Sequence, residues 1–168
     1  MSQSPPPPDA VDAIAAQWNT VRPDLSTDSM EVFGRIFRIS RTVTDQLGQA
    51  HAAFGIGTGE FDVIGTLRRS GAPYTLSPRE LTATLMLTTG GMTGRLDKLE
   101  RAGLVTRSPD PNDRRGLRIT LTPEGLDLAD RMIGSNIGVY DGVLATLTPE
   151  EAATLNALLR RLLASAGS

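Results

Sequence analysis

The sequence predicts a mainly α-helical protein with a small β-wing, in the order typical of a winged helix-turn-helix. Two short helices joined by a tight turn are expected between Ser77 and Gly103. A two-stranded hairpin with an arginine-rich tip is expected directly after them, because the apolar period changes from helical to alternating. Longer amphipathic helices are expected on both sides of this segment.

The N-terminal part is expected to hold a disordered arm followed by two helices. Residues 1–9 include four consecutive prolines, which favour a solvated polyproline II chain. Apolar residues recur at helical spacing over residues 10–21, up to an Arg-Pro pair that ends the pattern. A second helix is expected to begin at Asp28, with Glu31 at capping-box spacing, and to run to about Phe54.

The next segment carries the helix-turn-helix. A glycine-rich break over residues 55–59 precedes a third helix, and residues 74–76 favour a short strand. Ser77 then provides an N-cap, with proline at the first helical position and Glu80 completing a capping box. This helix is expected to end near residue 87, where two threonines cap a further helix that stops before Gly103.

Strands and helices complete the predicted chain. Residues 104–107 and 117–121 favour strands, and the turn-rich residues 108–116 favour the connection between them. One long helix is expected from Thr122 to about Leu147. A last helix, with a stripe of leucines on one face, follows it to the C-terminus.

Composition excludes several classes of function. The 168 residues fit one domain, and the absence of cysteine excludes disulfides, zinc ribbons and catalytic thiols. The single histidine, His51, makes a multi-histidine metal site improbable, and a structural role is favoured over a pH sensor. No nucleophile–base set, phosphate loop or metal cluster appears, so no catalytic or metal-binding residue is assigned and the protein is not expected to be an enzyme.

Cellular location is also constrained by the sequence. No apolar run reaches the length of a membrane helix, and the N-terminus lacks the basic and apolar regions of a signal peptide. We therefore expect no membrane partner and a cytoplasmic protein.

Positive charge is concentrated where a nucleic acid would bind. The net charge of the chain is −2, but residues 95–118 carry seven basic residues against four acidic ones, a net of +3. The segments before and after this one are both acidic. This distribution places a local basic patch on the second helix of the motif and on the wing.

That second helix has two distinct faces. At roughly 100° per residue, Met92, Leu96 and Leu99 fall within one arc. The opposite face holds small or polar residues, namely Gly90, Thr93, Gly94, Asp97 and Arg101. Each glycine costs about 1 kcal/mol of helix propensity relative to alanine, which suits a helix whose backbone closely approaches DNA bases. The plainer alternative is a flexible, solvent-exposed helix.

The motifs together resemble the MarR family of bacterial transcriptional regulators. The resemblance covers about residues 28–165, and the stretches that carry it are Ser77–Leu81, Gly91–Val105, Asp113–Gly116 and Leu121–Thr122. It implies a homodimer with interlocking terminal helices that binds a palindromic operator in double-stranded DNA. It also implies that Arg115 enters the minor groove and that Asp113 orients it, although the two side chains could simply form an ion pair that stabilises the turn. Gly94 departs from the family, where a polar residue is usual.

On this basis the chain is expected to have four parts. These are a disordered arm over 1–9, helices for dimerisation and for a ligand-site lid over 10–54, the DNA-binding lobe over 55–121, and dimerisation helices over 122–168. The residues expected to contact DNA are Thr88, Thr89, Gly90, Thr93, Gly94, Asp97, Lys98, Arg101, Asp113, Arg114 and Arg115.

A closer resemblance is to the urate-responsive branch of that family. It implies that Trp18 encloses the purine, that Asp62 lies beside it, that Arg95 couples it to the recognition helix and that Arg107 pairs with the anion. Taken singly, these residues also fit a packing anchor, a solvated carboxylate, a helix contact and a phosphate contact.

The expected function is therefore a repressor-type regulator that a small anionic aromatic effector, urate first, releases from its operator. No cofactor is expected, and the DNA-bound protein would be associated with the bacterial nucleoid. The alternatives are a phenolic or other aromatic acid as effector, or a winged-helix module that contacts proteins and has no ligand.

Overall fold

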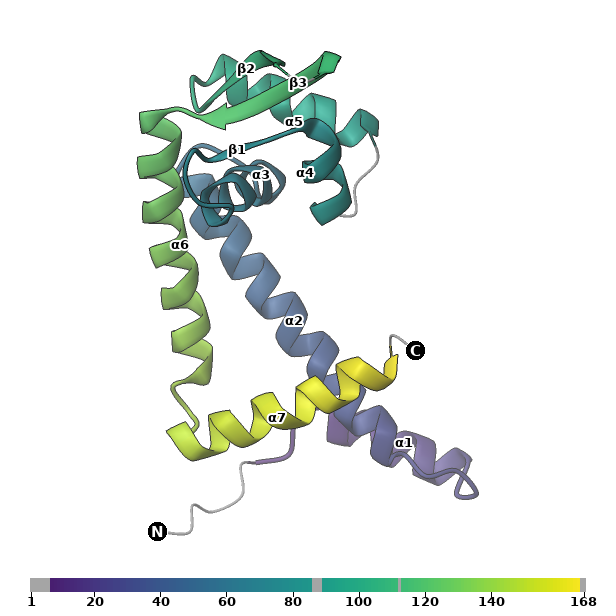
Figure 1. Cartoon of the computed structure of the whole chain (residues 1–168). Coiled ribbons are helices and arrows are strands. Elements are labelled where there is room, and N and C mark those ends of the chain that lie inside the picture. The colour runs from purple at the N-terminus through teal and green to yellow at the C-terminus, as the bar shows by residue number, and fades with distance from the viewer. Residues whose placement is uncertain (1–6, 86–88, 112, 167–168) are drawn as a thin grey trace. The chain divides into compact units, whose positions relative to one another are not determined.

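The computed structural model describes residues 7–85, 89–111 and 113–166, and it divides the chain into two compact units (Figure 1). The first unit comprises Met1–Asp45 and the second Gln46–Ser168. The elements are α1 (Ala10–Val21), α2 (Asp28–Ala53), α3 (Thr58–Arg69), β1 (Thr75–Leu76), α4 (Pro78–Leu85), α5 (Thr89–Arg101), β2 (Val105–Asp110), β3 (Asp113–Leu121), α6 (Pro123–Leu144) and α7 (Pro149–Ala166).

The first unit consists of α1 and most of α2. Asp9, which the sequence placed in the arm, is the N-cap of α1 and accepts hydrogen bonds from the backbone of Val11 and Asp12. Arg35 of α2 binds the carboxylates of Asp9 at 2.9 Å and Asp12 at 2.5 Å. A Cβ on Gly34 would lie 3.0 Å from Val11, so the glycine allows the two helices to pack closely. Residues 1–6 of the predicted arm lie outside the described residues.

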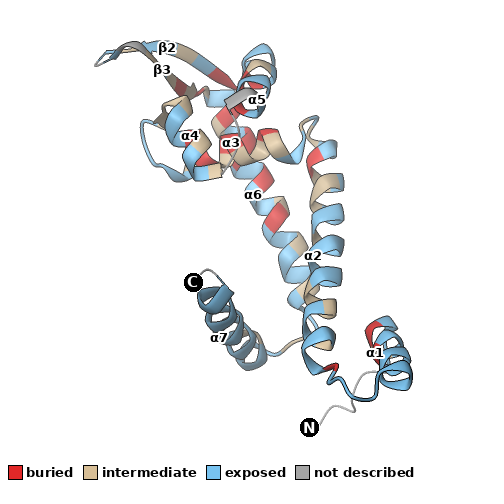
Figure 2. Ribbon diagram, turned by 90° about the vertical axis from the view of Figure 1, so that its right-hand side faces the viewer, coloured by how far each residue is buried: buried red, intermediate tan, exposed pale blue. Residues whose placement is uncertain are grey.

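The second unit contains a continuous hydrophobic core. Figure 2 shows the buried residues gathered on α3, on α5, at the base of β2 and β3, and on α6. The predicted apolar arc of α5 is buried as expected, with Met92 and Leu99 each 1% exposed and Leu96 3% exposed. Burial of these side chains fixes which face of α5 is turned outward.

The three strands form an antiparallel sheet in the order β1-β3-β2. The predicted connection over residues 108–116 was wrong in extent, because β2 continues to Asp110 and β3 begins at Asp113. Turn-type residues are tolerated here because β2 is an edge strand, where the missing N–H of Pro109 costs no ladder hydrogen bond. The register is irregular between Pro109 and Asp110, which accommodates the narrow end of the hairpin.

Helix boundaries follow the predicted caps closely. The backbone N–H of Ser77 donates to Glu80 at 2.7 Å, and that of Glu80 donates to the Ser77 hydroxyl at 3.2 Å. Thr148 and Glu151 form the same reciprocal pair at the start of α7. Helix α6 ends at Leu144, three residues earlier than expected.

The long helices leave many large apolar side chains exposed. On α6 and α7 these are Ile133, Ile137, Tyr140, Leu144, Leu155, Leu158, Leu159, Leu162 and Leu163. Along the described ranges, no helix combines the length and the hydropathy needed to span a bilayer.

The junction between α6 and the wing depends on a glycine. Thr122 caps α6 by accepting a hydrogen bond from the Gly125 N–H at 3.0 Å, and its hydroxyl donates to the Gly103 carbonyl at 2.7 Å. A Cβ on Gly125 would lie 2.0 Å from the backbone oxygen of Leu104. Backbone cannot move aside as a side chain does, so this position has no room for any other residue.

Gly125→Ala is therefore expected to lower the free energy of unfolding by about 2–3 kcal/mol or more, measured by urea denaturation. Gly94→Ala is the matched control, because a Cβ there meets nothing within 4 Å. Alanine at position 94 should raise stability by up to about 1 kcal/mol. Equal effects of the two substitutions would contradict the proposed backbone clash.

Candidate nucleic-acid interface and effector site

Helix α5 exposes a face of small and polar residues. Thr93, Gly94 and Arg101 are exposed on the side opposite the buried arc, and the space above Gly94 is open. Thr88 lies outside the described residues, and for Thr89 and Gly90 only the helical backbone is described. The described part of this face matches the small, polar surface that the sequence predicts.

The first contact that holds α5 is made by Arg95. Its Nη1 donates to the Gly59 carbonyl of α3 at 3.1 Å and lies 3.6 Å from the Asp62 carboxylate. A Cβ on Gly59 would lie 2.6 Å from the guanidinium carbon of Arg95. The glycine therefore provides the space that Arg95 occupies, as expected for an arginine on the flank of the apolar arc.

The second contact to α3 is made by Lys98. Its Nζ lies 3.1 Å from Glu60 Oε1, and the other carboxylate oxygen accepts a hydrogen bond from the Gly57 N–H at 3.1 Å. Burial by itself raises the pKa of Glu60, but the hydrogen bonds from Lys98 and from backbone N–H groups outweigh it and lower the pKa below its ordinary value. Glu60 is thus a charged, buried partner of the recognition helix.

The opposite flank of α5 is held by Arg107 of β2. Its Nη2 binds Asp97 at 2.5 Å, and its Nε lies 3.5 Å from the Glu100 carboxylate. The Nε is buried and has no hydrogen-bond partner. Two carboxylates of α5 therefore share one arginine of the wing.

The predicted DNA-binding residues accordingly have different environments. Asp97 and Lys98 form ion pairs with β2 and α3, whereas Arg101 is exposed and its Nε donates to the carbonyl of Asp97. Asp113 is exposed at the start of β3. The side chains of Arg114 and Arg115 lie outside the described residues.

The predicted effector residues are only partly brought together. Asp62 and Arg95 form a pair between α3 and α5, but no hydrogen bond or ion pair within the described residues joins Arg107 to either of them. Trp18 belongs to the first unit, where its side chain is 45% exposed.

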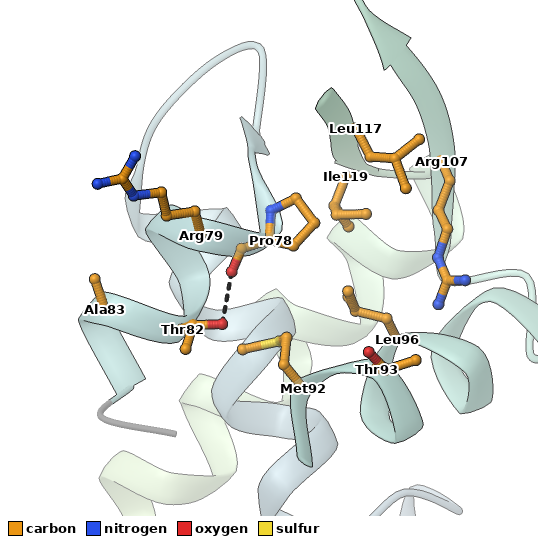
Figure 3. Close-up of a pocket in the computed structure, with 10 residues that line it drawn as sticks. All are labelled: Pro78, Arg79, Thr82, Ala83, Met92, Thr93, Leu96, Arg107, Leu117 and Ile119. Atoms are coloured by element: carbon orange, nitrogen blue, oxygen red, sulfur yellow. Dashed lines mark hydrogen bonds between the residues drawn. The ribbon is translucent and has the colours of Figure 1, made fainter. Parts of the chain in front are cut away.

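Arg107 instead borders a cavity of about 480 Å³ between α4, α5 and the wing (Figure 3). Figure 3 shows Arg79 pointing away from this cavity, with apolar side chains of α5 and β3 forming its walls. The lining residues are Pro78, Arg79, Thr82, Ala83, Met92, Thr93, Leu96, Arg107, Leu117 and Ile119. No sequence pattern indicates this cavity, because its lining residues come from four elements, α4, α5, β2 and β3, and most are ordinary core types.

Asp62 borders a second cavity of about 400 Å³ between α3 and α6. Phe61 and Ile133 contribute apolar surface, and Arg68 and Asp130 form an ion pair beside it at 2.7 Å. Burial raises the pKa of the Asp62 carboxyl above its ordinary value, although the positive charge of Arg95 opposes the shift.

His51 has a structural role, in agreement with the interpretation favoured by the sequence. It is 1% exposed, with Nε2 2.8 Å from Asn136 Oδ1 and Nδ1 3.1 Å from Thr58 Oγ1. An amide oxygen can only accept, so Nε2 carries a proton. The ring therefore links α2, α3 and α6 with both nitrogens satisfied.

The geometry defines a winged helix-turn-helix protein: α4 and α5 form the helix pair, and β2 and β3 form the wing. A model described as the MarR family matches residues 54–116. The transcriptional regulator PecS of Dickeya dadantii is 38% identical over 152 residues, which cover 90% of this chain and 92% of PecS. The chain belongs to the MarR family of winged-helix transcriptional regulators, whose members are not enzymes.

Solved structures agree with this assignment. A MarR variant from Escherichia coli in complex with operator DNA matches with a TM-score of 0.66 and 27% identity. The match covers 87% of this chain and 97% of the MarR chain. AbsC from Streptomyces coelicolor has a TM-score of 0.73 at 20% identity, covering 84% of this chain and 95% of that one. The second comparison supports the fold alone.

The raised pKa of Asp62 leads to a testable effect on stability. The folded protein holds a proton on this carboxyl more tightly than the unfolded chain does, so the charged form costs stability once the pH exceeds the folded pKa. Asp62→Asn is expected to raise Tm at pH 7, with a gain that disappears as the pH falls below roughly 4. Asp45→Asn, at a carboxyl whose side chain is 67% exposed, is the control in thermal unfolding. A lower Tm for Asp62→Asn at pH 7 would contradict the prediction.

Proposed function

We propose that this chain is a repressor that binds a palindromic operator as a homodimer and is released from it by a small anionic aromatic compound, with urate as the first candidate. The observation that carries the DNA-binding part is the outward face of α5 beside a basic wing. Gly94 faces open space and has no intramolecular reason to be a glycine. Its cost in helix propensity, about 1 kcal/mol, is understandable where backbone closely approaches base edges.

Two further observations support the assembly. Large apolar side chains are exposed along α6 and α7, and contiguous exposed apolar surface suits burial against a second copy. The related MarR was solved with operator DNA. A two-fold dimer would present two α5 helices to successive major grooves, so half-sites about one helical turn apart are expected.

Release by an anion follows from how α5 is held. Arg95 and Arg107 bind carboxylates on opposite flanks of the helix, and both are only about one-quarter exposed. A ligand anion that takes either guanidinium would displace a carboxylate that fixes α5. The ligand must bind this displaced arrangement more tightly than the DNA-competent one, which makes release a population shift. No cofactor is required.

The site predicted for urate consists of Trp18, Asp62, Arg95 and Arg107. The pairing of Asp62 with Arg95 and the cavity beside Asp62 support half of this site. A second possibility, a phenolic or other aromatic acid, is favoured by the other cavity. There an apolar space adjoins Arg107, whose guanidinium pairs with Asp97 and Glu100, so an aromatic acid would bind by taking the place of one of these carboxylates.

Arg115→Ala is expected to weaken operator binding about tenfold or more, because one minor-groove arginine is lost from each wing. The operator would be obtained by selection from a random-sequence duplex library, and affinity measured by gel-shift titration. Tm should not change. Unchanged affinity would remove the role assigned to the wing, and a lower Tm would mean that the residue is structural.

Arg95→Ala is expected to abolish the release of DNA by urate while the dimer stays intact, as measured by urate-dependent gel shift and by calorimetric titration. Ala83→Phe is the matched variant, because it fills the cavity beside Arg107 without touching Arg95.

A urate response that survives Arg95→Ala would refute the four-residue site. If benzoate rather than urate releases the DNA, and Ala83→Phe abolishes that release, the aromatic-acid alternative holds.

A further inference from the structure

The single lysine of the chain does not point toward the face that would meet DNA. Lys98 was assigned to the DNA-binding set, but its ammonium lies 3.1 Å from Glu60 on the neighbouring helix α3. Arg95, one turn earlier on α5, reaches the same first turn of α3 at Gly59. The two cations therefore occupy one flank of α5 and contact consecutive positions of α3.

The carboxylate that receives Lys98 is held in a prepared position. Glu60 is 9% exposed, and its Oε2 accepts a hydrogen bond from the Gly57 N–H. This hydrogen bond is part of the capping arrangement at the start of α3. A Cβ on Gly57 would lie 2.6 Å from that oxygen. The absence of a side chain at Gly57 thus allows the carboxylate to fold back and present Oε1 to Lys98.

We infer that Glu60 is a positioning residue, which fixes the recognition helix on α3 through Lys98, and that Lys98 is not a phosphate contact. The inference rests on the proposed function for its DNA-binding readout. If Lys98 turned to a phosphate, the Glu60 carboxylate would keep its backbone hydrogen bonds but lose the one cationic partner that the described residues give it, while remaining buried. An uncompensated buried charge is strongly unfavourable, so the pair is expected to persist in the complex.

The first experiment needs no DNA. Thermal unfolding of the full chain at one fixed protein concentration is compared for Glu60→Gln, Lys98→Met and the double variant. Each single substitution is expected to lower Tm by roughly 3–6 °C, and the double variant by no more than the larger single effect. Arg41→Met is the control, because its pair with Asp45 is 4.0 Å long and exposed, and its Tm should hardly change. Additive effects of Glu60→Gln and Lys98→Met would overturn the inference.

The second experiment separates positioning from phosphate binding. Affinity for the selected duplex is measured against salt concentration for Lys98→Met, Glu60→Gln and Arg101→Met. A lost phosphate contact reduces the slope of log K against log salt by about 0.9 per contact. We expect Arg101→Met to reduce the slope, whereas Lys98→Met and Glu60→Gln lower affinity with the slope unchanged and Lys98→Arg restores binding.

A reduced slope for Lys98→Met, together with undiminished affinity for Glu60→Gln, would overturn the inference. If the wild-type protein binds no duplex at all, the proposed function fails by itself. The thermal cycle would still decide whether Glu60 holds Lys98.

Discussion

Helix α5 can carry small and polar residues on its outward face only because the rest of its surface is held in place. Its apolar arc is buried in the core, its one flank is joined to α3 by Arg95 and Lys98, and its other flank is joined to β2 through Asp97. A glycine-bearing helix has a low intrinsic helix propensity, so these contacts must supply the order that the sequence lacks locally. The small residues that suit close approach to a partner depend on this support.

The same contacts explain why a net charge of −2 is compatible with an anionic partner. Each cation of the α5 region that the structure pairs is matched by a carboxylate on a neighbouring element. Under the proposed function, the guanidinium groups of Arg95 and Arg107 serve twice, for holding the fold and for binding an effector anion. Since an arginine bound to a carboxylate can exchange it for another anion, sensitivity to a small acid and sensitivity to DNA can arise from one set of groups.

Much of this arrangement could be predicted from the sequence. Helical spacing identified the buried arc at Met92, Leu96 and Leu99, and the capping boxes at Ser77 and Thr148 placed two helix starts to the residue. These signals are local, because they depend on residues within two turns of each other. The order of the elements followed from the same patterns, and the resemblance to a family added the expected dimer, the operator and the roles of the site residues.

The rest could not be predicted, because it depends on long-range contacts. Nothing local distinguishes Lys98, which binds Glu60 thirty-eight positions away, from Arg101, whose Nε donates to the Asp97 carbonyl of its own helix. Gly59 of α3 is a second example, since the space that it leaves for Arg95 becomes visible only when that side chain of α5 is in place. The strands are longer than expected, because Pro109 and Asp110 are typical turn residues that an edge strand can nevertheless accommodate.

The contact between Gly125 and the Leu104 carbonyl has a mechanical consequence. Main chain meets main chain there, and the Thr122 hydroxyl ties the same helix end to Gly103, so no rotamer change can absorb a displacement of the first turn of α6. We therefore expect that turn and the residues that lead into β2 to move together, so that a tilt of the long helix would also shift the root of the wing. Under the proposed function, the contacts that yield in this lobe would instead be the ion pairs along α5, because a carboxylate can be exchanged for another anion without moving main chain.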